Sequence, residues 1–179
     1  MMSAVRFSGW VLAIGGLLAL AAKTVAQESA EGFSADERAQ LLAGELVARP
    51  ITRREGAYHY VGGVSWQIVR APVDEVWEVV LDTAIYPRII PSLDEVEVVE
   101  EREDLRVVRM HHSYSVASAE YFSRVRIDRD NHQLRFDLDR SRPHELRAGR
   151  GFLSLRSYRG DTLVSWGVLA HVGAGMVMQ

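Results

Sequence analysis

The chain has 179 residues, 47% of them hydrophobic, and a formal net charge of −3 at neutral pH. This composition supports one packed domain and excludes a disordered chain, and the slightly acidic balance provides no basic field that would attract nucleic acid. The sequence contains no cysteine, which excludes disulfides, thiolate metal sites and a cysteine nucleophile.

The first 26 residues have the pattern of a secretory signal peptide. Arg6 supplies a positive start, residues 10–22 form an unbroken apolar run, and residues 24–26 are the small residues that a signal peptidase reads. As a helix the apolar run would be about 20 Å long, against roughly 30 Å of bilayer hydrocarbon, which favours a cleaved signal over a membrane span. We expect cleavage near Ala26 and a mature protein in the periplasm or outside the cell.

A helix and an edge strand are expected next. Ser34 and Glu37 form a capping-box pattern, which predicts that a helix starts there and covers residues 35–43. An edge strand is expected over residues 45–51, followed by a turn at residues 53–56.

The most informative stretch, residues 66–91, runs from a strand into two short helices. After Ala71-Pro72, apolar residues recur at helical spacing: Val73, Val76, Trp77, Val80 and Leu81. Pro72 suits the first helical position, where its missing N–H costs nothing. Tyr86-Pro87 starts a second short helix, and Pro91 ends it.

One long strand is predicted before this helical insert and six after it. The long strand covers residues 58–70. The later ones are expected at residues 95–101, 105–116, 121–129, 133–138, 145–156 and 162–172. Alternation of apolar and polar residues along them is typical of antiparallel strands with one covered face. We therefore expect an α+β fold with a strongly curved antiparallel sheet.

The apolar parity of these strands supplies the candidate site. His112 and Tyr114 are two apart on one face, so about 7 Å separates their backbones, and a buried histidine near a tyrosine suits acid–base chemistry. The alternative interpretation is two pocket-wall residues with satisfied hydrogen bonds, and for the larger aromatics a plain core role. The expected ligand-binding residues on the concave face are Val108, Met110, His112, Tyr114, Tyr121, Phe136, Phe152 and Trp166.

Metal chemistry finds little support in the sequence. His111 and His112 are neighbours in a strand and point to opposite faces, so they cannot share one ion. Residues 128–131 are similar to the start of a calcium loop, but Gln133 stands where the glycine should be, which favours a hairpin turn. We expect no metal and no cofactor.

The arginines of the polar parity are expected to form cross-strand ion pairs on a solvated face, and the weaker alternative is that they bind an acidic membrane surface. They are Arg109, Arg124, Arg126, Arg135 and Arg147.

The run of residues 68–82, followed by Tyr86-Pro87 and Pro91, resembles the START-like helix-grip superfamily, with the closest likeness to its polyketide cyclase/dehydrase and coenzyme Q-binding branch. The likeness covers about residues 58–172. It implies a hydrophobic cavity between a curved sheet and a long C-terminal helix. Only residues 173–179 follow the last predicted strand, so we expect that helix to be missing and the domain truncated. The concave face would then be covered by the N-terminal helix, by a partner, or not at all.

These features divide the chain into a signal peptide (1–26), an N-terminal helix and edge segment (27–56) and a START-like domain (57–179). The main hypothesis is a secreted or periplasmic protein that binds or transports a lipid, a quinone or another apolar small molecule. The alternatives are a cyclase/dehydrase-type enzyme using His112 and Tyr114, and a protein-interaction module. Nucleic acid is not an expected partner, while transient membrane contact and the oligomeric state stay open.

Overall fold

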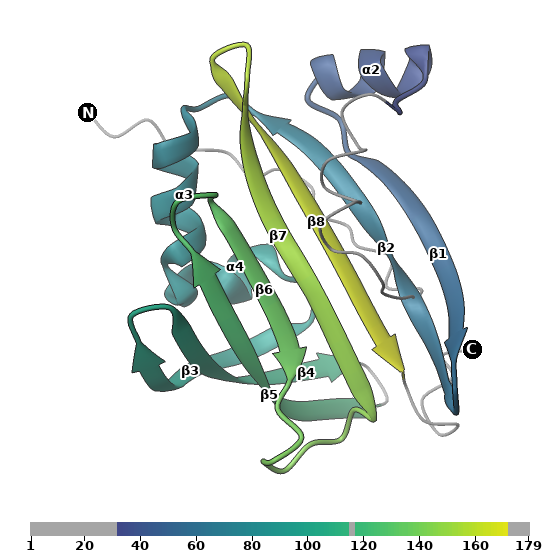
Figure 1. The fold of residues 1–179 in the computed structure, drawn as a ribbon, viewed down its shortest axis with the longest axis vertical. Helices are drawn as coiled ribbons and strands as arrows, with labels where there is room; N and C mark the ends of the chain where they lie inside the picture. The colour runs from purple at the N-terminus through teal and green to yellow at the C-terminus, as the bar shows by residue number, and fades with distance from the viewer. Residues whose placement is uncertain (1–31, 115–116, 172–179) are drawn as a thin grey trace.

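The computed structural model describes residues 32–114 and 117–171, with the side chains of Tyr114 and Ala117 excepted, so the predicted signal peptide lies outside the described residues. The elements, in chain order (Figure 1), are α2 (Ala35–Leu42), β1 (Val47–Glu55), β2 (Tyr58–Val69), α3 (Val73–Leu81), the 3-10 helix η1 (Thr83–Ile85), α4 (Tyr86–Ile89), β3 (Leu93–Arg102), β4 (Leu105–Tyr114), β5 (Ala117–Asp128), β6 (Gln133–Leu138), β7 (Ala148–Tyr158) and β8 (Asp161–His171).

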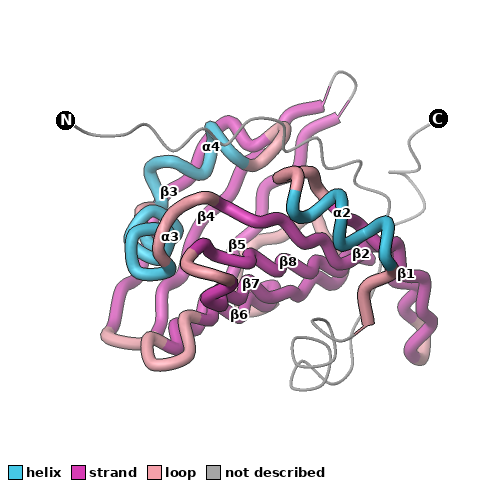
Figure 2. Tube along the Cα trace, turned by 90° about the horizontal axis from the view of Figure 1, so that it is seen from above, coloured by secondary structure: helices cyan, strands magenta, loops and turns pink. Residues whose placement is uncertain are grey.

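Eight antiparallel strands form one curved sheet in the order β1-β2-β8-β7-β6-β5-β4-β3. The first hairpin therefore pairs with the last strand, so that Val61 lies opposite Ala170. Figure 2 shows β3 and β4 turning away from the central strands, on the side where α3 and α4 lie. The α+β class and the helical insert after the first long strand are confirmed.

No α-helix in the described part of the chain is longer than α3, which has nine residues. None of the described helices has the length and apolar character needed to cross a membrane. The sequence predicts that a long helix is missing after the last strand. That position follows His171 and lies outside the described residues.

Helix α3 packs on one face of the sheet, which we call the inner face. Its apolar side Val76, Trp77 and Val80 is buried, and it contacts a cluster that includes Leu155 and Val164 of the central strands. Pro72 occupies the cap position, one residue before the helix, rather than its first turn.

Both ends of α3 are tied to neighbouring elements. At its start, the hydroxyl of Thr162, which has no exposed surface, donates a hydrogen bond of 2.7 Å to the carbonyl of Ala71. At its end, the Tyr86 hydroxyl donates to the Val80 carbonyl at 3.0 Å, and Arg106 donates to the Leu81 carbonyl at 2.5 Å. Because the last carbonyls of a helix lack partners within it, these donors stabilise the helix end.

Helix α2 packs on the opposite, outer face. Its capping box is present as predicted, with reciprocal hydrogen bonds between Ser34 and Glu37. Arg49 of β1 donates two hydrogen bonds to the Glu37 carboxylate, at 2.9 and 2.8 Å. Phe33 and Leu41 are buried in a cluster with β1, β2, β7 and β8 residues, namely Val47, Val64, Trp66, Ile68, Phe152 and Leu163.

This packing removes one of the expected covers for the concave face. In β2, Trp66 and Ile68 point to one face and pack with α2, whereas Val69 points to the other face and contacts the α3 cluster. Helices α2 and α3 therefore lie on opposite sides of the sheet. The N-terminal helix therefore does not cover the inner face. The predicted turn at residues 53–56 is also wrong, because Arg53 and Glu55 continue β1 opposite β2 and the chain turns at Gly56, with φ of 55°.

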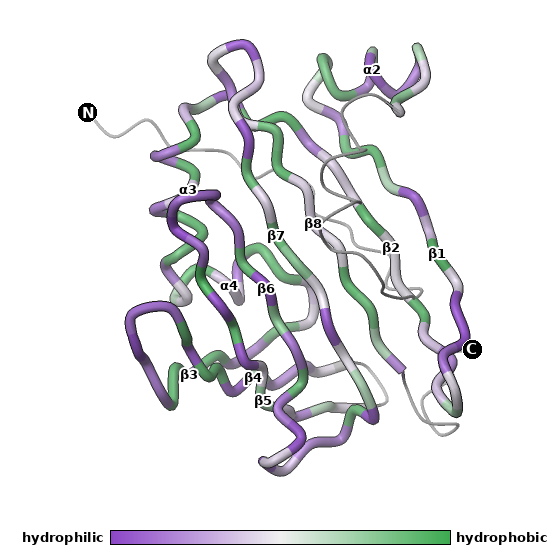
Figure 3. The backbone as a smooth tube through the Cα atoms, in the orientation of Figure 1, coloured by the Kyte–Doolittle hydropathy of each residue, from purple (hydrophilic) through white to green (hydrophobic). Residues whose placement is uncertain are grey.

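The polar side of the sheet carries the expected ion pairs at three of the five arginines, while Arg147 forms none with a described carboxylate. The pairs join neighbouring segments: Arg109 with Glu95, Glu97 and Glu120, Arg124 with Asp139, and Arg126 with Asp137. Arg135 donates instead to the Gln133 side chain at 2.9 Å. Figure 3 shows hydrophobic residues concentrated along the central strands and hydrophilic ones at the hairpin turns.

Candidate functional site

The strand register brings most of the expected ligand residues to the inner face. Met110 lies opposite Tyr121, while Phe136 lies opposite Val125 and Trp166 opposite Leu153. Val125 and Leu153 belong to the cluster packed on α3, which places Phe136 and Trp166 on the same face. The inner-face set is Val108, Met110, His112, Tyr121, Phe136 and Trp166. Tyr114 ends β4 on the same parity, but its side chain is outside the described part.

Phe152 is not a member of this set. It pairs with Arg135 and Gly167 and is buried in the outer-face cluster with Phe33 and Trp66. The residues of β7 alternate without a register shift, so Phe152 points away from the face that Leu153 and Leu155 share. Its expected place in the concave site is corrected: it is a core residue on the outer face.

Tyr121, rather than Tyr114, is the described hydrogen-bond partner of His112. The Nε2 atom of His112 lies 3.0 Å from the Tyr121 hydroxyl oxygen, and the two rings stack with centroids 5.6 Å apart and planes 9° from parallel. His112 is 6% exposed, while Tyr121 is half-buried. The pair therefore presents a phenol whose hydroxyl is oriented by a buried imidazole.

The surroundings of His112 favour its neutral form. Burial lowers the pKa of His112 below its usual 6.5, and this effect outweighs a hydrogen bond with the Pro91 backbone and the charge of Asp94, which both favour the imidazolium. A neutral imidazole can either accept the Tyr121 proton or donate its own, so the pair can serve as hydrogen-bond donor or acceptor toward an oxygen atom.

Phe136 lies across the middle of the inner face because Gly151 leaves room for it. A Cβ atom built on Gly151 would stand 2.3 Å from the Phe136 ring. This role of Gly151 was not predicted from the sequence. The available signal was a glycine within a strand, which often marks a site where another group approaches the backbone closely.

The inner-face residues differ in what they offer a ligand. Val108 is 1% exposed and closes the wall behind the site. The side chains that keep exposed surface are Met110, Tyr121, Phe136 and Trp166. Together they form an apolar strip with one polar end at the His112–Tyr121 pair. Within the described residues, no group of three histidine or carboxylate side chains is arranged to hold a metal ion.

The chain is similar to known proteins in part of its sequence and in its fold. Residues 69–156 match the family model described as polyketide cyclase / dehydrase and lipid transport. The expected likeness to the START-like helix-grip proteins is therefore confirmed. No curated protein matches the chain significantly in sequence.

Solved structures share the fold at low sequence identity. The Zhui aromatase/cyclase from Streptomyces sp. R1128 is 19% identical, with a TM-score of 0.52 and 72% of each chain covered. A STAR-related lipid transfer protein from Xanthomonas axonopodis is 10% identical, with a TM-score of 0.55 over 69% of this chain and 82% of that one. A START superfamily protein from Mycobacterium smegmatis is 12% identical, with a TM-score of 0.50 over 74% and 81%. The fold is thus the helix-grip fold.

Proposed function

We propose that the protein binds and carries an apolar small molecule or lipid on its inner face, in the periplasm or outside the cell. The observation that supports it is the apolar strip of Met110, Phe136 and Trp166 ending at the His112–Tyr121 hydrogen bond of 3.0 Å. A ligand with an apolar body and one hydroxyl or carbonyl oxygen complements such a strip, because apolar contacts supply affinity and a few polar groups fix orientation. The matching family description includes lipid transport.

Two substitutions in one strand test this proposal. Met110 and Leu105 both belong to β4 and are both half-buried, but they lie on opposite faces. Binding of a dansyl-labelled undecanoic acid is measured by fluorescence for the wild type, Met110→Gln and Leu105→Gln. We expect Met110→Gln to weaken binding about fivefold, because it removes apolar contact area from the ligand, and Leu105→Gln to leave it unchanged. Equal losses in both variants, or no binding by the wild type, would refute inner-face binding.

Native mass spectrometry of the purified chain supplies an independent measure. A ligand that co-purifies with the wild type and is depleted in Met110→Gln supports the proposal. Retention of the same ligand by both would place it elsewhere on the protein.

The His112–Tyr121 pair also favours one second candidate, a cyclase/dehydrase-type enzyme. A neutral imidazole in contact with a phenol can move a proton to or from a carbonyl-bearing substrate, and one structural neighbour is an aromatase/cyclase. Incubation with a linear poly-β-ketone, followed by mass spectrometry, tests this candidate. Turnover that disappears in both His112→Gln and Tyr121→Phe, with probe binding intact, supports the enzyme; turnover unaffected by either substitution, or none in the wild type, contradicts it.

A further inference from the structure

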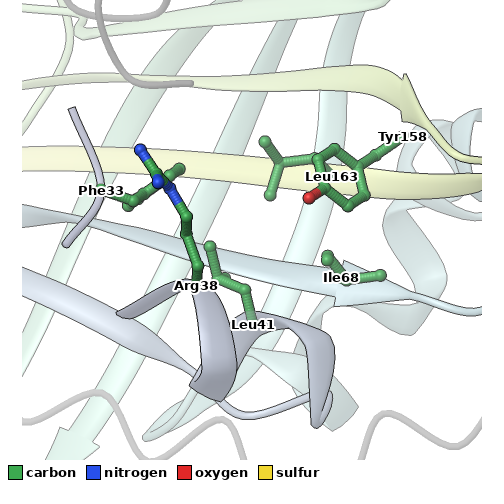
Figure 4. A pocket seen from close by; sticks show the side chains of 6 residues that line it. All are labelled: Phe33, Arg38, Leu41, Ile68, Tyr158 and Leu163. Atoms are coloured by element: carbon green, nitrogen blue, oxygen red, sulfur yellow. The ribbon is translucent and has the colours of Figure 1, made fainter. Parts of the chain in front are cut away.

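A second surface, on the outer face, combines apolar and cationic groups at one end of the molecule. Figure 1 shows α2 and the β7–β8 hairpin at the same end of the sheet. Between them lies a shallow hollow of about 40 Å³, whose lining residues are labelled in Figure 4: Phe33, Arg38, Leu41, Ile68, Tyr158 and Leu163. A neighbouring hollow shares Ile68 and Tyr158 and is also lined by Leu42 of α2, by Arg70 after β2, and by Arg159 and Asp161 of the β7–β8 hairpin.

Four arginines surround this surface without a carboxylate partner. Arg38, Arg70 and Arg159 are exposed and line the two hollows. Arg156 is half-buried and stands directly opposite Leu163 in the sheet. Among the described residues, no carboxylate forms an ion pair with any of the four. This contrasts with the paired arginines Arg109, Arg124 and Arg126 elsewhere on the sheet.

Arg156 points most directly to a missing anion. One of its terminal guanidinium nitrogens, Nη2, is buried and has no hydrogen-bond partner among the described residues. A buried charged donor without a partner is costly, and an anion at this surface would satisfy it. The one carboxylate that lines the hollows, Asp161, is outnumbered by the cations around it.

The shape of the surface favours a bilayer over an enclosed ligand. Sites that enclose small molecules have volumes of roughly 300–1,000 Å³, whereas the first hollow offers about 40 Å³. Leu42 is 51% exposed at its edge and is the large hydrophobic residue that the described structure leaves open to solvent. Leucine and tyrosine beside arginines are the pattern of an interfacial membrane contact, in which apolar tips enter the headgroup boundary and cations meet anionic lipids.

We propose that this arginine rim (Arg38, Arg70, Arg156 and Arg159, with Leu42 and Tyr158) docks the protein onto an anionic phospholipid bilayer. The complementarity is local, because the chain as a whole carries a net charge of −3. The rim lies on the face opposite the inner-face strip, so docking leaves the proposed ligand site facing away from the bilayer. This inference goes beyond ligand binding and does not depend on it.

Vesicle co-sedimentation of the full chain tests the proposal. The vesicles contain phosphatidylcholine with about 30 mol % phosphatidylglycerol, and phosphatidylcholine alone is the reference. The rim variant is Arg38→Gln/Arg70→Gln/Arg159→Gln, which leaves the partly buried Arg156 in place. The matched control, Arg88→Gln/Arg129→Gln/Arg147→Gln, removes three arginines that also lack carboxylate partners in the described structure but lie elsewhere.

The rim variant should bind anionic vesicles about a hundredfold less tightly than the wild type, since each arginine near an anionic surface contributes about fivefold. The control variant should retain most of the binding, and raising the salt concentration should weaken the wild type. Leu42→Gln should also reduce binding in the background of the intact rim. Equal losses in the rim and control variants would overturn the proposal.

Two further measurements distinguish membrane docking from binding of a soluble anion and from ligand binding on the inner face. If inorganic phosphate titrates the rim in solution and fully displaces the chain from vesicles at equal ionic strength, the rim is a soluble-anion site and docking is refuted. The dansyl fatty acid assay without vesicles reports the inner face alone. If the rim variant binds the dansyl fatty acid as tightly as the wild type does, its loss of vesicle binding reports docking and not ligand binding.

Discussion

The Nε2 atom of His112 and the hydroxyl oxygen of Tyr121 lie 3.0 Å apart, on neighbouring strands of the inner face. Their rings stack with planes 9° from parallel, so each side chain limits the rotation of the other. This contact places the polar group of the inner face at a fixed point beside an otherwise apolar strip. Its strength, and that of the packing on both faces, can be measured by substitution.

Tyr121→Phe should lower the free energy of unfolding by about 1 kcal/mol, because it removes one partner of a largely buried hydrogen bond. Urea denaturation measures the change. Tyr58→Phe is the matched control, since the Tyr58 ring contacts Tyr60 and His171 while no described hydrogen bond involves its hydroxyl. A loss of equal size in both variants would show that the His112 contact is not responsible.

Acid should weaken the fold through His112. Because burial lowers the pKa of His112 below 6.5, the unfolded chain binds this proton more readily than the folded one. Its contribution to stability is therefore full above about pH 6.5 and declines as the pH falls from there to the lower pKa of the folded state. Urea denaturation between about pH 7.5 and pH 5 should show a smaller decline in His112→Gln than in the wild type. The exposed His144 supplies the control His144→Gln, which should follow the wild type.

Gly167→Ala should destabilise the fold by about 1–3 kcal/mol through overpacking. A Cβ atom at this position would stand 2.4 Å from the Phe152 ring on the outer face. In a Phe152→Leu background the cost of Gly167→Ala should shrink, which a double-mutant cycle of thermal unfolding measures. Phe152→Leu alone should leave binding of the dansyl fatty acid unchanged, and weaker binding would contradict the placement of Phe152 outside the ligand site.

Tyr86 should resist ionisation. Removal of its hydroxyl from water raises its pKa to about 12, against the opposing charge of Arg106. The folded state therefore loses stability as the pH rises from about 10, the usual pKa, toward about 12, because deprotonation favours the unfolded chain. The sign follows from the raised pKa, because the folded chain holds this proton in a range where the unfolded chain has released it. Ultraviolet titration of the wild type should show one tyrosine ionising near pH 12 that is missing in Tyr86→Phe. Ionisation of every tyrosine near pH 10 would contradict this environment.

The sequence predicted the helical insert and all eight strands because both depend on local periodicity. Val76, Trp77 and Val80 repeat at helical spacing, and alternation along β4 and β8 assigned Met110 and Trp166 to one face before the register was known. The capping box of α2 was equally local, since Ser34 and Glu37 are three residues apart.

What the sequence did not predict depends on contacts between distant residues. Phe152 was placed by its size, although the parity of β7 decides its face, and that parity depends on a regular register through Gly149 and Gly151. The side on which α2 packs depends on Arg49 and Trp66, which lie outside the helix. The Tyr121 partner of His112 likewise required the β4–β5 register.

The strand order carries a consequence for how the chain is made. The β1–β2 hairpin finds its sheet neighbour only in β8, as the pairing of Val61 with Ala170 shows. Sheets closed by such distant pairings fold slowly, because the entropy of a long loop is lost before the contacts form. The N-terminal hairpin therefore stays without its neighbouring strand until β8 has left the ribosome, and the sheet is completed only at the end of synthesis.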